Sequence, residues 1–284
     1  MNSLPPSFPP ERPPKRPETE EAILVMGRRI LRHEVKRAEA EIFSPATIVQ
    51  SGAATIRKPH VNGVNQDRYI DDPVHRVYAV FDGVGGDEHG DEAAEAVARY
   101  VRTMTSARFL GARAIPRVLD LQNVMNQQRS ILTGANQAIF DDTLARGSAT
   151  TATLAEIVEA EERTFAIWSS IGDSRIYRHD IDTRKMRQLS NDEGSGNRIH
   201  KALTGYRNSM STVVQSGIVE LRHGDGLVLV TDGVTGDYGD DIMHPNELEY
   251  YYSEAVTATD AAKSLVAHAR KIDDRTAVVV RVGE

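Results

Sequence analysis

The 284-residue sequence contains no cysteine. This absence excludes disulfide bonds, thiolate zinc sites, iron–sulfur clusters and every cysteine nucleophile. Whatever chemistry the chain performs therefore proceeds without a covalent cysteine intermediate.

Positive charge and long apolar runs are also scarce. The chain has 34 Lys and Arg against 41 Asp and Glu, a formal net charge of -7 and a pI of about 5.8. Proteins that bind duplex nucleic acid usually present a basic face, so we expect no nucleic-acid partner. No apolar run approaches the roughly 18 residues of a membrane span, and no secretory signal pattern is visible. We therefore expect no membrane span and a cytoplasmic location.

The chain is predicted to divide into three parts. Residues 1–19 contain seven of the twelve prolines and predict a disordered tail, with a docking segment for a proline-binding partner as the alternative. Residues 20–45 predict a basic helix (20–42) and a linker; this helix either packs on the domain edge or binds a partner or membrane surface. Residues 46–284 have the pattern of a globular domain.

Within this domain, strand patterns come in runs and helical patterns are set apart. The β-rich runs cover 46–50, 74–81, 150–158, 164–171, 174–178, 217–221, 227–231 and 276–282. The helical stripes cover 92–106, 116–141 and 260–272. A regular alternation of strand and helix is absent, which disfavours a doubly wound parallel sheet. The pattern predicts an α+β domain with antiparallel sheets.

Aspartates recur where predicted strands end. Asp82 follows an apolar strand and precedes a glycine, and Asp232 does the same further along the chain. Such carboxylates are held on rigid elements but stay accessible. Gathered together, they would raise one another's pKa unless a cation neutralised them, and oxygen ligands suit Mg²⁺ or Mn²⁺. Each Asp-Gly alone is more typical of a turn.

Seven short segments then make a specific pattern. In chain order they are Asn65-Gln66-Asp67-Arg68, Val80-Phe81-Asp82-Gly83-Val84-Gly85-Gly86, Gly147-Ser148-Ala149-Thr150-Thr151-Ala152, Ile171-Gly172-Asp173-Ser174-Arg175-Ile176-Tyr177, Leu189-Ser190-Asn191-Asp192, Leu229-Val230-Thr231-Asp232-Gly233 and Asp273-Asp274-Arg275-Thr276. Over residues 46–284 the chain resembles the metal-dependent, type 2C (PPM) family of serine/threonine protein phosphatases, in its bacterial form.

The resemblance implies a fold and an activity. The expected fold is an antiparallel β-sandwich flanked by helices, in four α-β-β-α layers. The expected activity is hydrolysis of phosphoserine and phosphothreonine in proteins, by water activated between two Mg²⁺ or Mn²⁺ ions. The expected partner is a phosphorylated protein whose modification opposes that of a serine/threonine kinase.

The resemblance also implies a set of site residues. The metal ligands carried over from the family are Asp82, the Gly83 carbonyl, Asp232, Asp273, Asp67 and Asp173. Asp82 would bridge two ions, and Asp232 and Asp273 would bind one of them. Asp67 would act on the attacking water or as a ligand, so that Asp67, Asp82 and Asp232 are the expected catalytic residues. Asp173 matches the ligand of a third, weaker ion.

The chain departs from the family at the position that grips the substrate phosphate. Many members carry an arginine where this chain has Asn62. Asn62 and Arg68 are the substrate-binding candidates, and Lys58 and His60 are further substitutes for the missing arginine. The residues themselves do not distinguish among them.

Other departures affect the metals and the flap. Gln66 replaces a glutamate, Val84 a histidine, and Gly236 an acidic residue for which Asp237 could compensate. Residues 191–210 predict a mobile flap beside the site. These differences leave two alternatives to an active phosphatase: a catalytically impaired module that binds phosphoproteins or regulates a partner, and a hydrolase of small phosphate esters.

Overall fold

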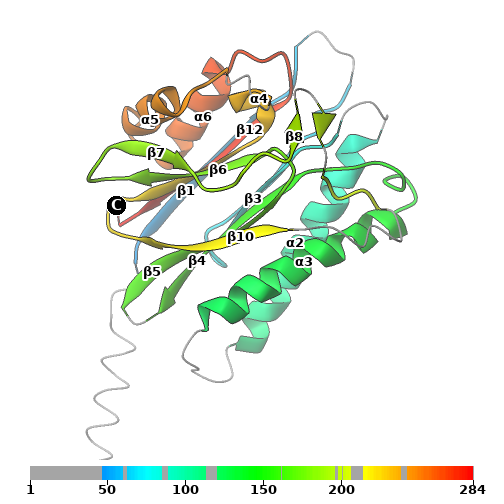
Figure 1. The fold of residues 1–284 in the computed structure, drawn as a ribbon, viewed down its shortest axis with the longest axis horizontal. Coiled ribbons are helices and arrows are strands. Elements are labelled where there is room, and N and C mark those ends of the chain that lie inside the picture. Colours follow the sequence, from blue (N-terminus) through cyan, green and yellow to red (C-terminus); the bar gives the residue numbers. More distant parts are fainter. Residues whose placement is uncertain are drawn as a thin grey trace, which may run out of the picture. The chain divides into compact units, whose positions relative to one another are not determined.

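Two five-stranded antiparallel sheets form the centre of the protein (Figure 1). The first sheet has the order β1 (Val49–Ile56), β12 (Arg275–Val282), β11 (Gly226–Val230), β6 (Arg175–Asp180) and β7 (Lys185–Gln188). The second has the order β10 (Gln215–Leu221), β5 (Arg163–Ile171), β4 (Ala152–Ala160), β3 (Val77–Phe81) and β2 (Arg68–Asp72). Every neighbouring pair within these sheets is antiparallel, as the sequence predicts.

This computed structural model describes most of the chain. The described residues are 47–59, 63–84, 89–112, 120–160, 162–195, 198–199, 201–205, 214–237 and 242–283. They belong to one compact unit, Thr47–Glu284. The predicted tail 1–19 and the basic helix and linker 20–45 lie outside the described residues, as does Asn62.

The helices form two outer layers (Figure 1). On one side lie α2 (Gly90–Ala112) and α3 (Leu121–Asp141), and on the other α5 (Pro245–Ser253) and α6 (Ala258–His268). A single-turn helix, α4 (Asp232–Thr235), directly follows β11. The resulting order is helix, sheet, sheet, helix, which confirms the predicted four-layer sandwich. No helix among the described residues is long and apolar enough to cross a bilayer.

Strand β12 shows how one apolar run serves two cores. Val278 and Val280 pack between the two sheets, whereas Ala277 and Val279 pack against α5 and α6. Successive side chains of a strand point to opposite faces, so a strand covered on both sides must be apolar throughout. This explains why the central strands read as continuous hydrophobic segments.

The sequence patterns missed the more polar elements. Strands β2 and β7 lie at sheet edges and carry few apolar residues, so neither shows a clear alternation. Helix α5 was also not predicted. The first strand covers Val49–Ile56 and not 46–50, and the last helix ends at His268 and not at 272. The last four residues of the predicted range, 269–272, lie after the helix and include Lys271.

Candidate metal-binding site

Five aspartates gather near the start of α4, which Figure 1 shows at one end of the sheets together with β8 (Gly194–Ser195). We call Asp67, Asp82, Asp173, Asp232 and Asp273 the aspartate cluster. Each lies just before or just after a strand. Repulsion from nearby carboxylates contributes to the raised pKa values of Asp67, Asp82, Asp173 and Asp232, as expected where the segments converge. The tertiary structure therefore brings together all of the aspartates predicted as metal ligands.

Asp67 is the most enclosed member of the cluster. Its side chain is buried, and Thr231 donates a hydrogen bond from Oγ1 to Asp67 Oδ2 over 2.9 Å. Thr231 is itself fixed, because its Oγ1 accepts a bond from the Thr276 backbone N at 3.0 Å. Asp67 Oδ1 has no hydrogen-bond partner among the described residues. Burial, with added repulsion from Asp274 and Asp232, raises the pKa of Asp67 to about 7.

Asp82 is held through its backbone. Its N–H donates to Thr151 Oγ1 at 3.1 Å, and its carbonyl accepts from Thr150 Oγ1 and Thr151 N, both at 2.8 Å. The carboxyl group is thereby aimed into the cluster. Burial, and then repulsion from Asp232 and Asp67, raises the pKa of Asp82 well above its usual value. A bound cation would stabilise the ionised form of this carboxyl group, because it would offset the repulsion from Asp232 and Asp67.

Asp173 lies in the tight turn between β5 and β6. The turn requires Gly172, whose φ of 105° suits glycine and whose missing Cβ would lie 2.6 Å from Thr151 Cγ2. Asp173 is buried and its Oδ1 has no hydrogen-bond partner among the described residues. Burial, followed by repulsion from Asp232, raises the pKa of Asp173 to about 7.

Asp232 and Asp273 share a cation that belongs to the chain. The Lys271 ammonium bonds Asp232 Oδ2 and lies 3.1 Å from Asp273 Oδ2. It also donates to Asp237 Oδ1 at 2.8 Å. Burial alone would lower the pKa of Lys271, but these carboxylates raise it far above its ordinary value. Lys271 was not predicted as a site residue; its position two residues before Asp273 was the only available signal.

Two glycines allow the chain segments to approach closely. A Cβ on Gly83 would lie 2.4 Å from the Gly90 carbonyl oxygen and 2.7 Å from that of Gln66. A Cβ on Gly233 would lie 1.8 Å from the Asp274 carbonyl oxygen. Glycine is therefore required after both Asp82 and Asp232 by packing, in addition to any role of the Gly83 carbonyl.

Asp274 has a different role from its neighbour Asp273. Its two carboxylate oxygens accept bonds from the backbone N–H groups of Lys58 and Gln66, each at 2.7 Å. Its own N–H donates to Asp273 Oδ1 at 2.9 Å. Asp274 therefore holds the backbone of Lys58 and of Gln66 against the start of β12.

The candidates for phosphate binding are placed differently. Lys58 reaches the cluster, with its Nζ 4.0 Å from Asp273 Oδ1. Arg68 is engaged elsewhere: its Nε donates to Glu95 at 2.9 Å, and its NH1 donates to the carbonyls of Asn65 and Asp67 at 2.7 and 2.9 Å. Asn62 and His60 lie outside the described residues.

The described part of the predicted flap is tied to the Asp173 turn. Arg175 and Asp192 form a buried ion pair at 2.6 Å, and Glu193 N donates to the Gly172 carbonyl at 3.0 Å. Beyond Glu193, β8 and β9 (Arg198–Ile199) form a short hairpin. The base of the flap is thus fixed to the cluster side of the sandwich.

The donor set fits a hard divalent cation. All five cluster side chains are carboxylates, and the buried oxygens of Asp67 and Asp173 that lack a partner among the described residues can serve as ligands of a cation. Among the described residues, however, no three acidic or histidine side chains converge closely enough to form a finished metal cage. The cation that sits among three carboxylates is the Lys271 ammonium.

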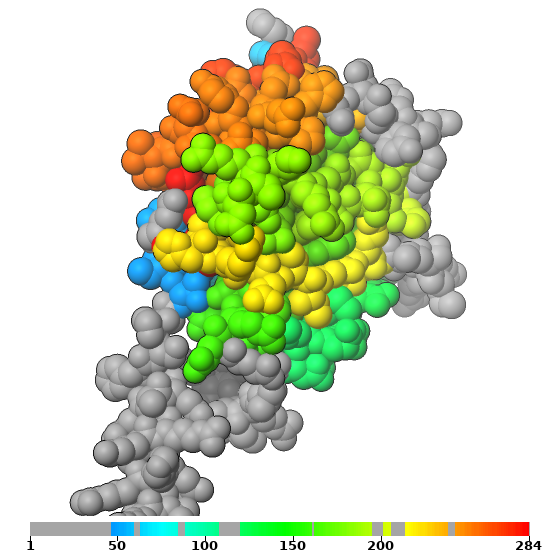
Figure 2. Space-filling model, turned by 60° about the vertical axis from the view of Figure 1, so that its left-hand side comes forward, coloured from blue at the N-terminus to red at the C-terminus, as the bar shows by residue number. Residues whose placement is uncertain are grey.

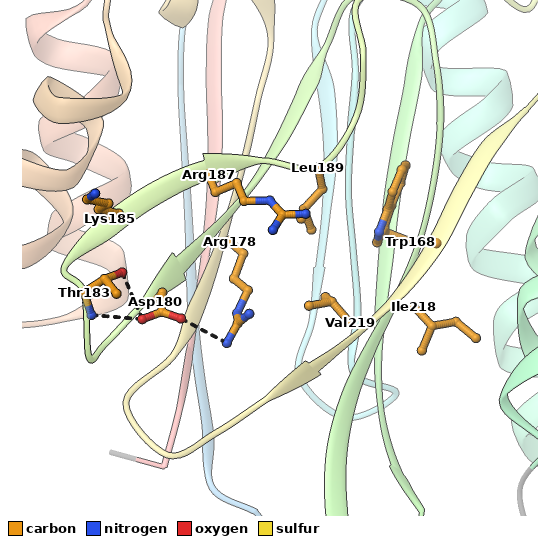
Figure 3. A pocket seen from close by; sticks show the side chains of 10 residues that line it. Trp168, Arg178, Asp180, Thr183, Lys185, Arg187, Leu189, Ile218 and Val219 are labelled. Carbon is orange, nitrogen blue, oxygen red and sulfur yellow. Dashed lines mark hydrogen bonds and ion pairs between the residues drawn. The ribbon is translucent and has the colours of Figure 1, made fainter.

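A separate cavity of about 410 Å³ opens between the edge strands β7 and β10. Figure 2 shows this face, and Figure 3 shows the basic side chains of Arg178, Lys185 and Arg187 opposite Trp168. Arg178 is paired, with its NH2 2.8 Å from Asp225 Oδ2. No predicted site residue is among the described residues that line this cavity. It is therefore distinct from the aspartate cluster.

Comparison with protein families supports the sequence resemblance. Residues 57–269 match the family model described as protein phosphatase 2C. This match covers most of the chain and includes Asp67, Asp82, Asp173 and Asp232. No curated protein sequence matches the chain.

Solved structures share the fold. The catalytic domain of the serine/threonine protein phosphatase PstP in complex with two manganese ions has a TM-score of 0.65 and 21% identity, over 84% of this chain and 100% of that one. PppA, a key regulatory component of the T6SS in Pseudomonas aeruginosa, has a TM-score of 0.62 and 20% identity, over 82% and 97%. The phosphatase MsPP from Mycobacterium smegmatis, in complex with cacodylate, has 0.62 and 20%, over 83% and 99%.

Proposed function

This chain belongs to the protein phosphatase 2C family, and we propose that it hydrolyses phosphoserine and phosphothreonine in proteins with the help of Mg²⁺ or Mn²⁺. The observation that carries the proposal is the convergence of Asp67, Asp82, Asp173 and Asp232, whose pKa values are all raised. Groups with perturbed pKa values that meet in one place are typical of functional sites. Here the perturbation is one that bound cations would relieve.

In this proposal, Asp82, the Gly83 carbonyl, Asp232 and Asp273 hold two ions, and Asp173 is the ligand of a third. When bound, the ions supply positive charge that lowers the pKa of water and stabilises the phosphoryl oxygens in the transition state. Asp67 orients the attacking water and accepts its proton. The buried Asp67 Oδ1 supports this role, because it has no hydrogen-bond partner among the described residues and can accept a proton.

We propose Lys58 as the residue that binds the substrate phosphate. Its ammonium lies 4.0 Å from Asp273 Oδ1 and is partly exposed, so it can contact the cluster and an incoming anion together. Arg68 is a weaker candidate because its guanidinium already bonds Glu95 and two backbone carbonyls. Lysine binds phosphate as a point charge and lacks the paired donors of arginine.

The test is hydrolysis of a phosphothreonine peptide by the purified full chain, with Mn²⁺ and with EDTA. We expect turnover with Mn²⁺, loss of turnover with EDTA, and loss in Asp82→Asn. Asp182→Asn is the matched control. Asp182 is exposed, is not a member of the aspartate cluster, and forms an ion pair with Arg222 over 2.6 Å. Turnover that ignores EDTA would refute the proposal, and faster turnover of small phosphate esters would favour the small-substrate alternative.

A second candidate function is phosphoprotein binding without turnover. The Lys271 ammonium favours it, because this group bonds Asp232 and lies close to Asp273, two of the proposed metal ligands. The same assay separates the two functions. Folded protein that binds a phosphopeptide in a fluorescence titration, yet releases no phosphate at any Mn²⁺ concentration, would establish the second.

We further propose that the protein acts in the cytoplasm on the products of a serine/threonine kinase. The match to the protein phosphatase 2C family supports the choice of substrate. Fractionation of cells that produce the full chain, followed by immunoblotting, tests the location.

A further inference from the structure

Lys271 reaches the aspartate cluster from the segment that joins α6 to β12. Its Nζ contacts three carboxylates that come from different positions: Asp232 at the start of α4, Asp237 after α4, and Asp273 before β12. The Lys271 side chain is only 16% exposed. The contact is therefore an enclosed one and differs from an ordinary surface ion pair.

The ammonium donates hydrogen bonds to Asp232 and Asp237 and forms an ion pair with Asp273. A lysine ammonium has three N–H donors, and here three carboxylates surround it. Two of the oxygens involved are Asp232 Oδ2 and Asp273 Oδ2, which belong to proposed metal ligands. A divalent ion that binds these same oxygens meets an ammonium already in contact with them.

The other side of the cluster has no such partner. Asp67 Oδ1 and Asp173 Oδ1 are buried and lack a hydrogen-bond partner among the described residues. Lys271 acts on Asp173 through its charge without a direct contact, whereas it touches Asp232, Asp237 and Asp273 directly. The two sides start from different electrostatic conditions.

We propose that Lys271 is a tethered cation that competes with one of the two metal ions for Asp232 and Asp273. This inference rests on the proposed metal-dependent function of the same cluster. The first ion binds at Asp82 and the Gly83 carbonyl, and the described contacts of Lys271 do not include either residue. The second ion binds Asp232 and Asp273 only when the Lys271 ammonium leaves them.

Asp237 can hold the Lys271 ammonium after this group has left Asp232 and Asp273. It holds Nζ at 2.8 Å, is 28% exposed, and is not among the residues proposed to hold the two main ions. The long, flexible stem of lysine allows the ammonium to keep this contact while it gives up the other two. The second metal ion is therefore bound more weakly than the first, and its affinity is set by Lys271.

Isothermal titration calorimetry of the metal-free full chain with Mn²⁺ tests the inference without a measurement of turnover. Wild type should bind one ion tightly and a second weakly. Lys271→Met should lower the dissociation constant of the second ion by about tenfold and leave the first nearly unchanged. Lys263→Met is the matched control, because Lys263 is an exposed lysine of α6.

Lys271→Gln is measured beside Lys271→Met in case the apolar variant folds poorly without metal. The glutamine is neutral but keeps amide donors for Asp237, and it should also tighten the second site. Equal dissociation constants in wild type and both variants would overturn the inference while leaving the phosphatase proposal intact. A wild type and variants that bind no Mn²⁺ at all would overturn both.

Discussion

Asp67 and Asp173 are buried carboxyl groups whose Oδ1 atoms lack a hydrogen-bond partner among the described residues, whereas Asp232 and Asp273 share the Lys271 ammonium. Both pairs occupy one cluster and face the same problem of gathered negative charge. Burial raises the pKa of Asp67, Asp173 and Asp232 alike, but among these three only Asp232 is in direct contact with the lysine. A metal ion that binds Asp232 and Asp273 therefore meets an ammonium that does not touch Asp67 or Asp173.

The largest effect on turnover is expected from replacement of the residue that lies between the two pairs of aspartates. Asp82 faces both Asp67 and Asp232. Asp82→Asn should reduce turnover of a phosphothreonine peptide with Mn²⁺ by a factor on the order of 10²–10³, because a proposed shared ligand is lost. The same change removes a repelling charge, so it should raise the melting temperature in EDTA. Unchanged turnover would contradict the assignment of Asp82.

Removal of the Lys271 ammonium should leave Asp232 and Asp273 without contact to this lysine, a contact that Asp67 and Asp173 lack in the wild type. Lys271→Met leaves Asp232, Asp237 and Asp273 without their ammonium, which should cost about 3 kcal/mol of stability without metal. Thermal and urea unfolding in EDTA measure this loss, with Lys263→Met as the control. Addition of Mn²⁺ should restore most of the difference. Equal stability of wild type and Lys271→Met in EDTA would show that the ammonium does not neutralise the cluster.

The raised pKa of Asp67 should make the stability of the metal-free protein depend on pH. The folded-state pKa of Asp67 is raised from 3.8 to about 7, so the folded protein holds a proton that the unfolded chain releases. That contribution is present at low pH and is lost as pH rises through the folded pKa. In EDTA, the melting temperature should therefore rise as pH falls from about 8 to about 5.

His179 acts with the opposite sign in this range, because burial lowers its pKa and its contribution is lost as pH falls. The comparison is therefore made with Asp67→Asn, which keeps His179. The variant should show a smaller rise in melting temperature on acidification. Parallel pH profiles for wild type and Asp67→Asn would contradict the raised pKa of Asp67.

The smallest effect is expected at the edge of the cluster. Lys58→Met should raise KM for a phosphopeptide by about fivefold, or roughly 1 kcal/mol, with little change in kcat. The matched variant Arg68→Met should act mainly on stability, since Arg68 bonds Glu95 and backbone carbonyls. Initial rates over a range of substrate concentrations measure both. A larger KM change in Arg68→Met would assign the phosphate contact to Arg68.

Local sequence patterns were most successful where structure depends on apolar periodicity. Strands β11 and β12 are buried over nearly their whole length, and α3 buries Leu132 and Ile139 along one face. Polar edge strands such as β7 carry too little of this signal. The packing of two sheets into a sandwich was predicted from the family resemblance, because the pattern of strands and helices alone predicted only an α+β domain with antiparallel sheets.

The candidate site divides in the same way. The Asp-Gly pairs at Asp82 and Asp232 mark carboxylates at strand ends, and glycine is required there because a Cβ would collide with a neighbouring backbone. The partner of Asp232 could not be predicted in this manner. Lys271 lies 39 residues further along the chain and within the range predicted to be helical.

The aspartates, the glycines beside them and the resemblance to type 2C phosphatases could be read from short segments, because each of these segments has its own pattern. Which charges meet depends on the packing of distant segments. The tertiary structure placed Asp274 on the backbone of Lys58 and Gln66, and Lys271 among three carboxylates. Charge pairing depends on distance in space, which is fixed when separate strands and loops pack at one end of the sandwich.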